Sequence, residues 1–442
     1  MQFHILSFEG PDPYSRSGGL ATRVIGLSST LASLGCETHL WFIGDPDLPG
    51  HEQAGDLHLH RWCQWVSEYH PGGVYDGEEG KVADYNHSLP PFLAAQALMP
   101  HLQSSLRGVV LAEEWQTVHA VLHLHWLLER AGLRDRVTIL WNANNTFGFD
   151  RIPWDQLRQA CTITTVSRYM KHRMREWGVE ALVIPNGLDA SAFDPPDRPT
   201  VQLLRRRFRD RVLLTKMARW DPDKRWLGTL DIIQALKQQG ARPLLVARGG
   251  NEAYGSEVWR GAQDRGLRVI DRKASVDGTK GLVEALQDVG DADIVNLTSF
   301  VDAPSRSALF RGTDAVLANS GHEPFGLVGL ETMAVGGIAA TGCSGEDYAV
   351  PGQNALVLET DDPREFISFF HSMKLEPTRM AQMRRAGRAT ARRYAWPHVV
   401  ERVLMPRVEA RSYEKIGDLD PPDEYIPQPS DEPIDPVDVD EG

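Results

Sequence analysis

The feature that most constrains the fold is a regular alternation of short apolar runs with segments of helical periodicity. The run Phe3–Phe8 is followed by a loop, and apolar residues then recur three and four positions apart over residues 20–34. That spacing places them on one face of a helix. Gly35 ends the predicted helix and Thr38–Ile43 resumes as a strand, so the segment predicts a βαβ unit of a parallel sheet covered by helices.

The alternation occurs in two series. In the first, strands are predicted over Val109–Ala112, Val137–Trp141 and Thr162–Val166, and a helix over Gln116–Arg130, while residues 50–100 predict long loops. In the second, strands are predicted over Val212–Met217, Pro243–Ala247, Leu267–Ile270 and Ala315–Ala318, and helices over Trp226–Gln238 and Phe325–Val335. The proline-rich segment Phe193–Pro199 between the series is typical of a linker. We predict an α/β protein of two doubly wound domains with a cleft between them, in which ligands bind at the carboxyl ends of the strands.

The acidic residues are concentrated at the C-terminal end. The chain has 442 residues and a formal net charge of −13, and residues 416–442 hold ten acidic residues, six prolines and no Lys or Arg. Such a stretch cannot bury enough apolar surface to offset its ordering entropy, so it predicts a disordered tail. The rest of the chain then carries a net charge of about −3.

The composition argues against several classes of protein. A near-neutral body lacks the basic face of a general nucleic-acid binder. The N-terminus has no signal-peptide pattern, and no apolar run reaches the roughly 18 residues of a membrane span. The four cysteines are far apart, which argues against a disulfide framework or a structural zinc site. We therefore expect a cytoplasmic protein with reduced thiols and no nucleic-acid partner, and its oligomeric state stays open.

Gly18 and Gly19 lie between the first strand and the first helix. Adjacent glycines let a backbone approach a ligand closely, and the helix N-terminus behind them favours an anion. The same residues also suit a tight turn. The GxGxxG and GxxxxGK[ST] fingerprints are absent, so neither a Rossmann dehydrogenase nor a P-loop NTPase is supported.

Arg219 and Lys224 follow the first strand of the second series and flank an Asp-Pro-Asp turn. A guanidinium and an ammonium at the carboxyl end of a strand suit a diphosphate. A solvated basic turn is the alternative interpretation.

Two glutamates frame the predicted helix near residue 325. Pro324 suits the first turn of a helix, whose free amide groups would point at an anion. Glu323 lies in the loop before the helix and Glu331 two turns inside it. A carboxylate in the loop can stabilise positive charge on a reacting carbon, and one in the helix can accept hydrogen bonds from ribose hydroxyls.

Polar side chains also follow two strands of the first series. Glu114 ends one strand, and Asn144 and Asn145 follow the next. Amide and carboxylate groups at strand ends favour sugar binding, as a weaker hypothesis. The sequence shows no HExxH motif, and no metal is expected.

The order and spacing of these motifs resemble those of retaining GT-B glycosyltransferases of the family 4 type, relatives of glycogen and sucrose synthases. The resemblance extends from about residue 2 to about residue 410. The residues that carry it are Gly18-Gly19, Val166-Ser167, Pro185–Asp189, Arg219 with Lys224, and Glu323 to Glu331.

The resemblance implies a GT-B fold and transfer of a hexose from a nucleoside-diphosphate sugar to a hydroxyl acceptor, a saccharide or a small polyol or glycoside. The configuration would be retained, with no metal or other cofactor. The resemblance also implies roles for the residues. Arg219 and Lys224 would contact the diphosphate, together with the amides of Phe325, Gly326 and Leu327. Glu331 would hold the ribose, Glu323 would lie beside the sugar, and Gly18 and Gly19 would approach the donor from the first domain.

The chain departs from the family at the donor-sugar histidine. Many relatives have His-Asp-Trp where this chain has Glu113-Glu114-Trp115, and Thr-Ile-His-Asn near Asn144 and Asn145. As a hypothesis, an amide of Asn144 or Asn145 replaces the histidine, and Asn144→Ala then loses transfer but keeps nucleotide binding.

The predicted domains are residues 1–197 on the acceptor side, residues 198–393 binding the nucleotide sugar, and a tail at 413–442. A segment at about 394–412 would cross back onto the first domain. Two other functions stay open: a nucleotide-sugar epimerase, and a non-catalytic nucleotide-sugar-binding scaffold.

Overall fold

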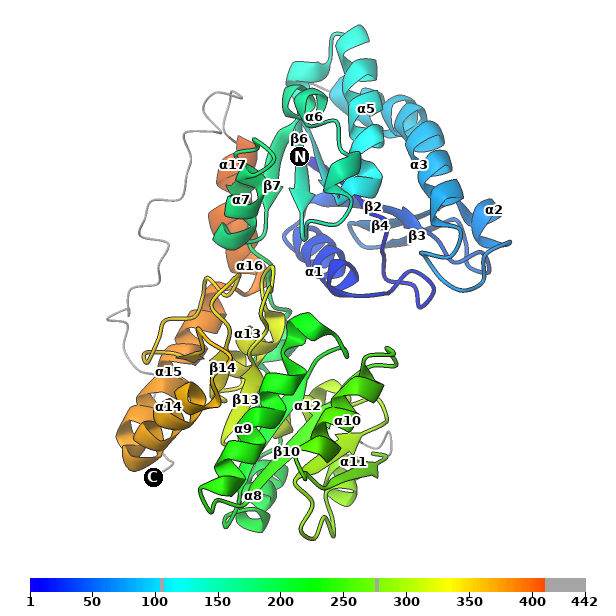
Figure 1. The fold of residues 1–442 in the computed structure, drawn as a ribbon. Coiled ribbons are helices and arrows are strands. Elements are labelled where there is room, and N and C mark those ends of the chain that lie inside the picture. Colours follow the sequence, from blue (N-terminus) through cyan, green and yellow to red (C-terminus); the bar gives the residue numbers. More distant parts are fainter. Residues whose placement is uncertain (104–106, 275–277, 410–442) are drawn as a thin grey trace.

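The computed structural model of the chain describes residues 1–103, 107–274 and 278–409, and it has two lobes, each built on one sheet (Figure 1). The predicted acidic tail lies outside the described residues. None of the helices in the described ranges is both long and apolar enough to cross a membrane. The predicted α/β class with two Rossmann-like units is confirmed.

The first lobe contains an eight-stranded sheet of order β3-β4-β2-β1-β5-β6-β7-β8. All its pairings are parallel except β3 with β4. In sheet order the strands are β3 (His51–Ala54), β4 (Leu57–Trp62), β2 (Glu37–Ile43), β1 (Gln2–Leu6), β5 (Gly108–Glu113), β6 (Val137–Ala143), β7 (Thr162–Thr165) and β8 (Leu182–Val183).

Helices cover both faces of this sheet (Figure 1). They are α1 (Gly19–Ser33), α2 (Gln64–Ser67), α3 (Glu78–Phe92), α4 (Met99–Gln103), α5 (Val118–Arg130), α6 (Trp154–Ala160) and α7 (Arg168–Arg175). The middle of the predicted apolar stripe of α1 is buried, because Val24, Leu27 and Leu31 pack on the sheet, whereas Leu34 at its end is exposed.

The second lobe contains a seven-stranded parallel sheet of order β11-β12-β10-β9-β13-β14-β15. Its strands are β11 (Val269–Arg272), β12 (Ile294–Leu297), β10 (Pro243–Arg248), β9 (Val212–Met217), β13 (Ala315–Ala318), β14 (Ala339–Thr341) and β15 (Leu356–Val357). Its helices are α8 (Arg198–Arg207), α9 (Trp226–Gln238), α10 (Gly255–Asp264), α11 (Gly278–Ala285), α12 (Ala303–Gly312), α13 (Leu327–Ala334), α14 (Pro363–Leu375) and α15 (Pro377–Arg393).

The last described segment returns from the second lobe to the first (Figure 1). It comprises α16 (Trp396–Val399), the π-helical turn η7 (Val400–Leu404) and α17 (Met405–Glu409). Its apolar side chains share a core with β1 and α1, and Trp396 is 1% exposed. A Cβ on Gly187 would lie 2.3 Å from a ring carbon of Trp396, so glycine is required where the linker passes this ring.

The prediction of long loops over residues 50–100 is wrong in part. β3, β4 and α3 lie in this segment, and the π-helical turn η1 (Leu93–Leu98) continues α3. β4 alternates His with Leu and β3 is mostly polar, so neither strand has an apolar run. Pro90 and Pro91 lie inside α3, where prolines are normally disfavoured. Both features weaken the patterns on which sequence interpretation depends.

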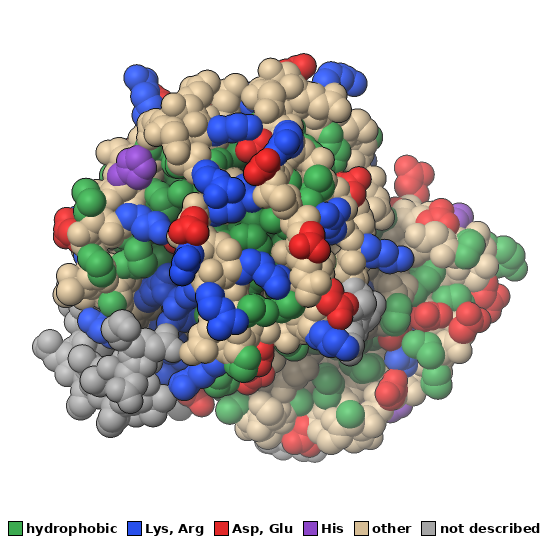
Figure 2. All heavy atoms as spheres, turned by 90° about the horizontal axis from the view of Figure 1, so that it is seen from below, with side chains coloured by type: hydrophobic (Ala, Val, Ile, Leu, Met, Phe, Trp, Pro, Cys, Tyr) green, Lys and Arg blue, Asp and Glu red, His purple; other side chains and the backbone are tan. Residues whose placement is uncertain are grey.

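The surface of the second lobe is rich in charge although the body of the chain is near neutral. Viewed from below, its end carries many Lys and Arg side chains with acidic side chains between them (Figure 2). The low net charge therefore reflects similar numbers of acidic and basic side chains, and not a lack of charged side chains.

Candidate active site

Two loops meet at the carboxyl edge of the second sheet, one after β9 and one after β13. The Lys224 ammonium donates a hydrogen bond to the Glu323 carboxylate, and both side chains are 18% exposed. The Gly321 amide donates to the carbonyl oxygen of Asp223 at 2.7 Å. The structure thus brings together two predicted site residues that lie 99 positions apart in the chain.

Arg219 lies in the same loop as Lys224, and its side chain is exposed. Its backbone is fixed, because its carbonyl oxygen accepts a hydrogen bond from the indole of buried Trp226 at 2.8 Å. Among the described residues, no ion pair engages its guanidinium. A fixed backbone with an uncommitted cation suits an anionic ligand.

The helix predicted from Phe325 begins two residues later, at Leu327. Gly326 has φ +78°, a left-handed conformation that stops the helix from extending backwards, so Pro324 is not in the first turn. A Cβ on Gly326 would lie 2.7 Å from Glu346 Cγ and 3.3 Å from Glu323 Cγ. The Phe325 side chain is buried against Tyr348 and so contributes to packing.

Two charged residues that the sequence analysis missed support this edge. Lys216 is buried and donates to Asn319 Oδ1 at 2.8 Å and to the Leu317 carbonyl at 3.1 Å. Its burial, with Lys224 nearby, lowers its pKa to about 7. A lysine inside the apolar run of β9 is a signal that the sequence did offer.

Glu346 is the second missed residue. Its carboxylate accepts from the Ser344 amide at 3.1 Å, while its Oε1 has no partner among the described residues. Burial and the neighbouring Glu323 raise its pKa to about 8. It lies in the loop after β14, at the same edge as Glu323. An acidic residue in a glycine-rich loop was a pattern that the sequence itself showed.

Glu331 lies inside α13, next to the segment that joins the lobes. It forms an ion pair with Arg306 of α12 at 3.4 Å. Burial raises its pKa, and Asp189 of the linker adds to that effect, whereas Arg306 opposes it. Glu331 is therefore held on the linker side of the second lobe.

The start of α1 already has an anion. Glu9 Oε2 accepts hydrogen bonds from the amides of Gly18 and Ala21 at 3.0 Å and of Ser17 at 3.3 Å. A Cβ on Gly18 or Gly19 would meet nothing within 4 Å, so no packing within the protein requires glycine there. A ligand that used these amides would compete with Glu9.

A buried polar network lies at the ends of β5 and β6. Arg23 pairs with Glu113 at 2.9 Å and donates to Asn186 at 2.8 Å. The Glu113 carboxylate also accepts from the amides of Asn142 at 2.9 Å and Asn144 at 2.8 Å. The Asn144 side-chain amide is thus committed inside the protein.

Glu114 has an unusual backbone conformation and a raised pKa. Its φ is +68°, a conformation that is uncommon outside glycine and that clusters at functional sites. Its carboxyl accepts a hydrogen bond from the Asn144 backbone amide at 2.7 Å, and the residue is only 4% exposed. Burial raises its pKa to about 8, and Glu113 and Glu9 add to the shift. A pKa of about 8 favours the protonated carboxyl near neutral pH.

Asn145 differs from its neighbour. Its side chain is exposed, and its Oδ1 accepts from the amide of Phe147 at 2.7 Å, which is a turn contact. The structure brings Glu114 and Asn144 together but gives Asn145 a local role.

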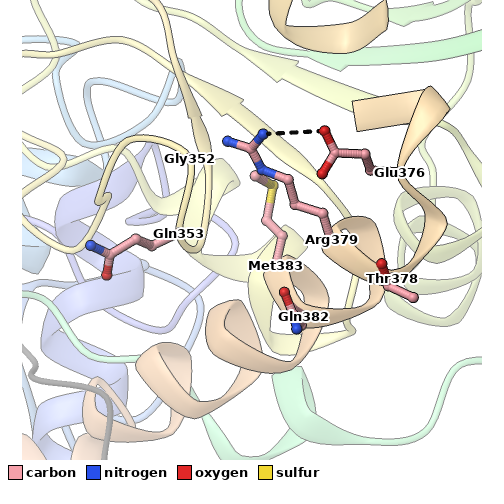
Figure 3. A pocket seen from close by; sticks show the side chains of 7 residues that line it. All are labelled: Gly352, Gln353, Glu376, Thr378, Arg379, Gln382 and Met383. Carbon is pink, nitrogen blue, oxygen red and sulfur yellow. Dashed lines mark ion pairs between the residues drawn. The ribbon is translucent and has the colours of Figure 1, made fainter. Parts of the chain in front are cut away.

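A pocket of about 410 Å³ lies away from this edge, between the turn at Gly352–Gln353 and the first half of α15. In the close view, Arg379 and Glu376 point toward each other across its rim, paired at 3.9 Å (Figure 3). It contains none of the predicted site residues.

Comparison with known proteins agrees with the fold. Residues 17–192 match the model of Glycosyltransferase Family 4. A D-inositol 3-phosphate glycosyltransferase of Segniliparus rotundus is 27% identical over 226 residues, which are 50% of this chain and 45% of that protein. The matches to such relatives cover between 29% and 52% of the relatives' own length.

Solved structures match along nearly the whole chain. Sucrose-phosphate synthase from Thermosynechococcus elongatus has a TM-score of 0.60 at 16% identity and covers 93% of this chain and 100% of its own. HepE of Anabaena, solved with UDP and glucose, has a TM-score of 0.59 at 14% identity and covers 91% and 98%. The fold is that of GT-B proteins. The match of residues 17–192 to the family model agrees with the predicted resemblance to glycosyltransferases of the family 4 type over that part of the chain.

Proposed function

We propose that the chain transfers a hexose from a nucleoside-diphosphate sugar to a hydroxyl acceptor, with retention of configuration and without a metal. The observation that carries this proposal is the cationic loop of Arg219 and Lys224 held against Glu323 at the carboxyl edge of the second sheet.

Arg219 and Lys224 would neutralise the leaving diphosphate. Charge develops on this group as the glycosidic bond breaks, and cations fixed in advance stabilise it without reorganisation. Lys224 is already oriented by Glu323, so the donor phosphate would share a cation that the protein holds in place. Glu323 would then lie beside the anomeric carbon and stabilise its developing positive charge.

Glu114 would contact the hexose in place of the histidine that many relatives have. A protonated carboxyl can donate a hydrogen bond to a sugar hydroxyl, which an ionised one cannot. The hydrogen bond from the Asn144 backbone amide fixes the carboxyl at the end of β5. This assignment revises the hypothesis that the Asn144 side-chain amide replaces the histidine, because that side-chain amide donates to Glu113.

The acceptor hydroxyl would attack on the face from which the diphosphate leaves, and a phosphate oxygen would take its proton. The enzyme then needs only to position the acceptor and stabilise the leaving group. Because several relatives are named as D-inositol 3-phosphate glycosyltransferases, we include phosphorylated polyols among the acceptors, beside saccharides and glycosides.

A panel of UDP-, ADP- and GDP-hexoses tests the proposal through release of nucleoside diphosphate. Release that depends on an acceptor supports the transferase. Isomerisation of the sugar without release supports the epimerase, and binding without either reaction supports the scaffold. Binding alone is read from thermal stability, because a ligand that binds only the folded state stabilises it.

A further inference from the structure

A cluster of histidines lies on the first sheet, across β1, β2, β4 and β3. Parallel register pairs His4 with His39 and His39 with His58, so the three lie in one row across β1, β2 and β4. In the next row His60 pairs with Trp41 and, across the hairpin, with His51. Because side chains two residues apart share a face of a strand, both rows lie on the same face.

The imidazoles of the two rows are packed against one another. The centroids of His39 and His58 are 4.4 Å apart with an interplanar angle of 18°, and those of His51 and His60 are 4.8 Å apart. His39 Nδ1 lies 2.9 Å from His60 Nε2. The remaining His39 nitrogen, Nε2, faces Glu37 Oε1 at 3.2 Å.

Glu37, His39 and His58 each offer one ligand atom, and these atoms all lie within 4.8 Å of one another. Ligand atoms on a tetrahedral zinc ion are roughly 3.3 Å apart, given zinc–ligand distances of about 2.0–2.1 Å. Small rotations of exposed Glu37 and half-buried His58 would therefore close the site. Imidazole and carboxylate ligands suit Zn²⁺.

A buried chain of hydrogen bonds orients these groups from behind. The Trp41 indole donates to His4 Nδ1 at 3.2 Å, which leaves the His4 proton on Nε2, where it donates to Gln2 Oε1 at 2.9 Å. The Gln2 amide nitrogen must then point the other way, and it donates to Glu37 Oε1 at 2.9 Å. Such outer partners of ligands fix their orientation and raise metal affinity.

We propose that Glu37, His39 and His58 hold a Zn²⁺ ion on the first sheet. The ion would join β2 to β4 and so fasten the β3–β4 hairpin, whose outer strand β3 is fully exposed, to the rest of the sheet. The site is independent of sugar transfer, because it lies at the amino ends of the strands.

Titration of the chelator-treated full chain with Zn²⁺, followed by calorimetry and thermal unfolding, tests the site. We expect one equivalent to bind and to raise the melting temperature by about 2 °C or more at saturation. The double variant Glu37→Gln/His58→Ala changes only accessible side chains, and it should lose this binding at least tenfold while keeping its fold.

His119→Ala is the matched control, since His119 is an exposed histidine of the same lobe, on α5. It should bind Zn²⁺ as the unaltered chain does. The proposal is overturned if the unaltered chain binds no zinc, if zinc leaves the melting temperature unchanged, or if the double variant binds as tightly as the control.

Discussion

The carboxyl edges of the two sheets differ in whether their charged side chains are buried or accessible. At the first edge the charged groups are buried and satisfied by one another: Arg23 neutralises Glu113, and Glu9 is bound by the amides of α1. At the second edge Arg219 is exposed, and the pair of Lys224 with Glu323 remains partly accessible. Two sheets of similar topology thus leave different groups available to a ligand. We infer that the second edge binds the diphosphate and that the first contacts neutral parts of the substrates.

The largest expected effect comes from Arg219→Ala. Removing one preorganised donor to the leaving diphosphate should lower the turnover number by about 10²–10³-fold. Arg209→Ala is the matched control, because Arg209 is 76% exposed and lies at the amino end of β9. Equal turnover numbers for both variants in a steady-state assay would contradict the inference that the second edge binds the diphosphate.

The second prediction concerns the proton on Glu114. Its carboxyl is protonated below its pKa of about 8 and ionised above it. Turnover should therefore fall as the pH rises through about 8, approaching tenfold per pH unit, because the ionised form cannot donate a hydrogen bond.

The variant Glu114→Gln keeps a donor without a titration, so its pH profile should lose this alkaline decline. Glu346→Gln is the informative comparison, since Glu346 has a similar pKa at the other edge. A decline that persists in Glu114→Gln and disappears in Glu346→Gln would assign the functional proton to the second edge.

The third prediction concerns stability at the first edge. Glu9→Ala removes the acceptor for three amides at the start of α1, and it should lower the free energy of unfolding by about 1 kcal/mol. Glu68→Ala, a change at an exposed position, serves as the control in chemical denaturation. Equal stability of the two variants would show that Glu9 does not stabilise the helix.

The same two variants test whether the amides at the start of α1 can bind a phosphate. If the α1 amides can bind a phosphate, then Glu9→Ala should bind pyrophosphate more tightly than the Glu68→Ala control. Equal affinities would assign all phosphate binding to the second edge.

The smallest expected effect is that of removing the acidic tail. A chain truncated after Lys415 loses the ten acidic residues of 416–442 and should keep its turnover number unchanged. A large loss of activity would contradict the separation of the tail from catalysis.

Strong periodicity made much of the fold predictable. The strand Val212–Met217 and the helix Trp226–Gln238 have the predicted bounds, because apolar runs and an amphipathic stripe determine them locally. The start of α13 was misplaced because Gly326 has a left-handed conformation and its carbonyl accepts a hydrogen bond from the distant Tyr348 hydroxyl, neither of which a local pattern contains.

The candidate site was predictable only in part. The sequence pointed to Arg219, Lys224 and Glu323 because charged residues at strand ends stand out from apolar runs. It did not reveal that Glu9 accepts hydrogen bonds from the α1 amides or that burial raises the pKa of Glu114. Both depend on burial and on tertiary partners that are distant in sequence.

The most direct test of sugar transfer with retention is the anomeric configuration of the product. An α-linked nucleoside-diphosphate hexose and its acceptor would be incubated with the full chain, and the new glycosidic bond examined by NMR. We predict an α-linked product formed in equal amount to the nucleoside diphosphate released. A β-linked product, or a donor consumed without transfer in the presence of acceptor, would contradict the account.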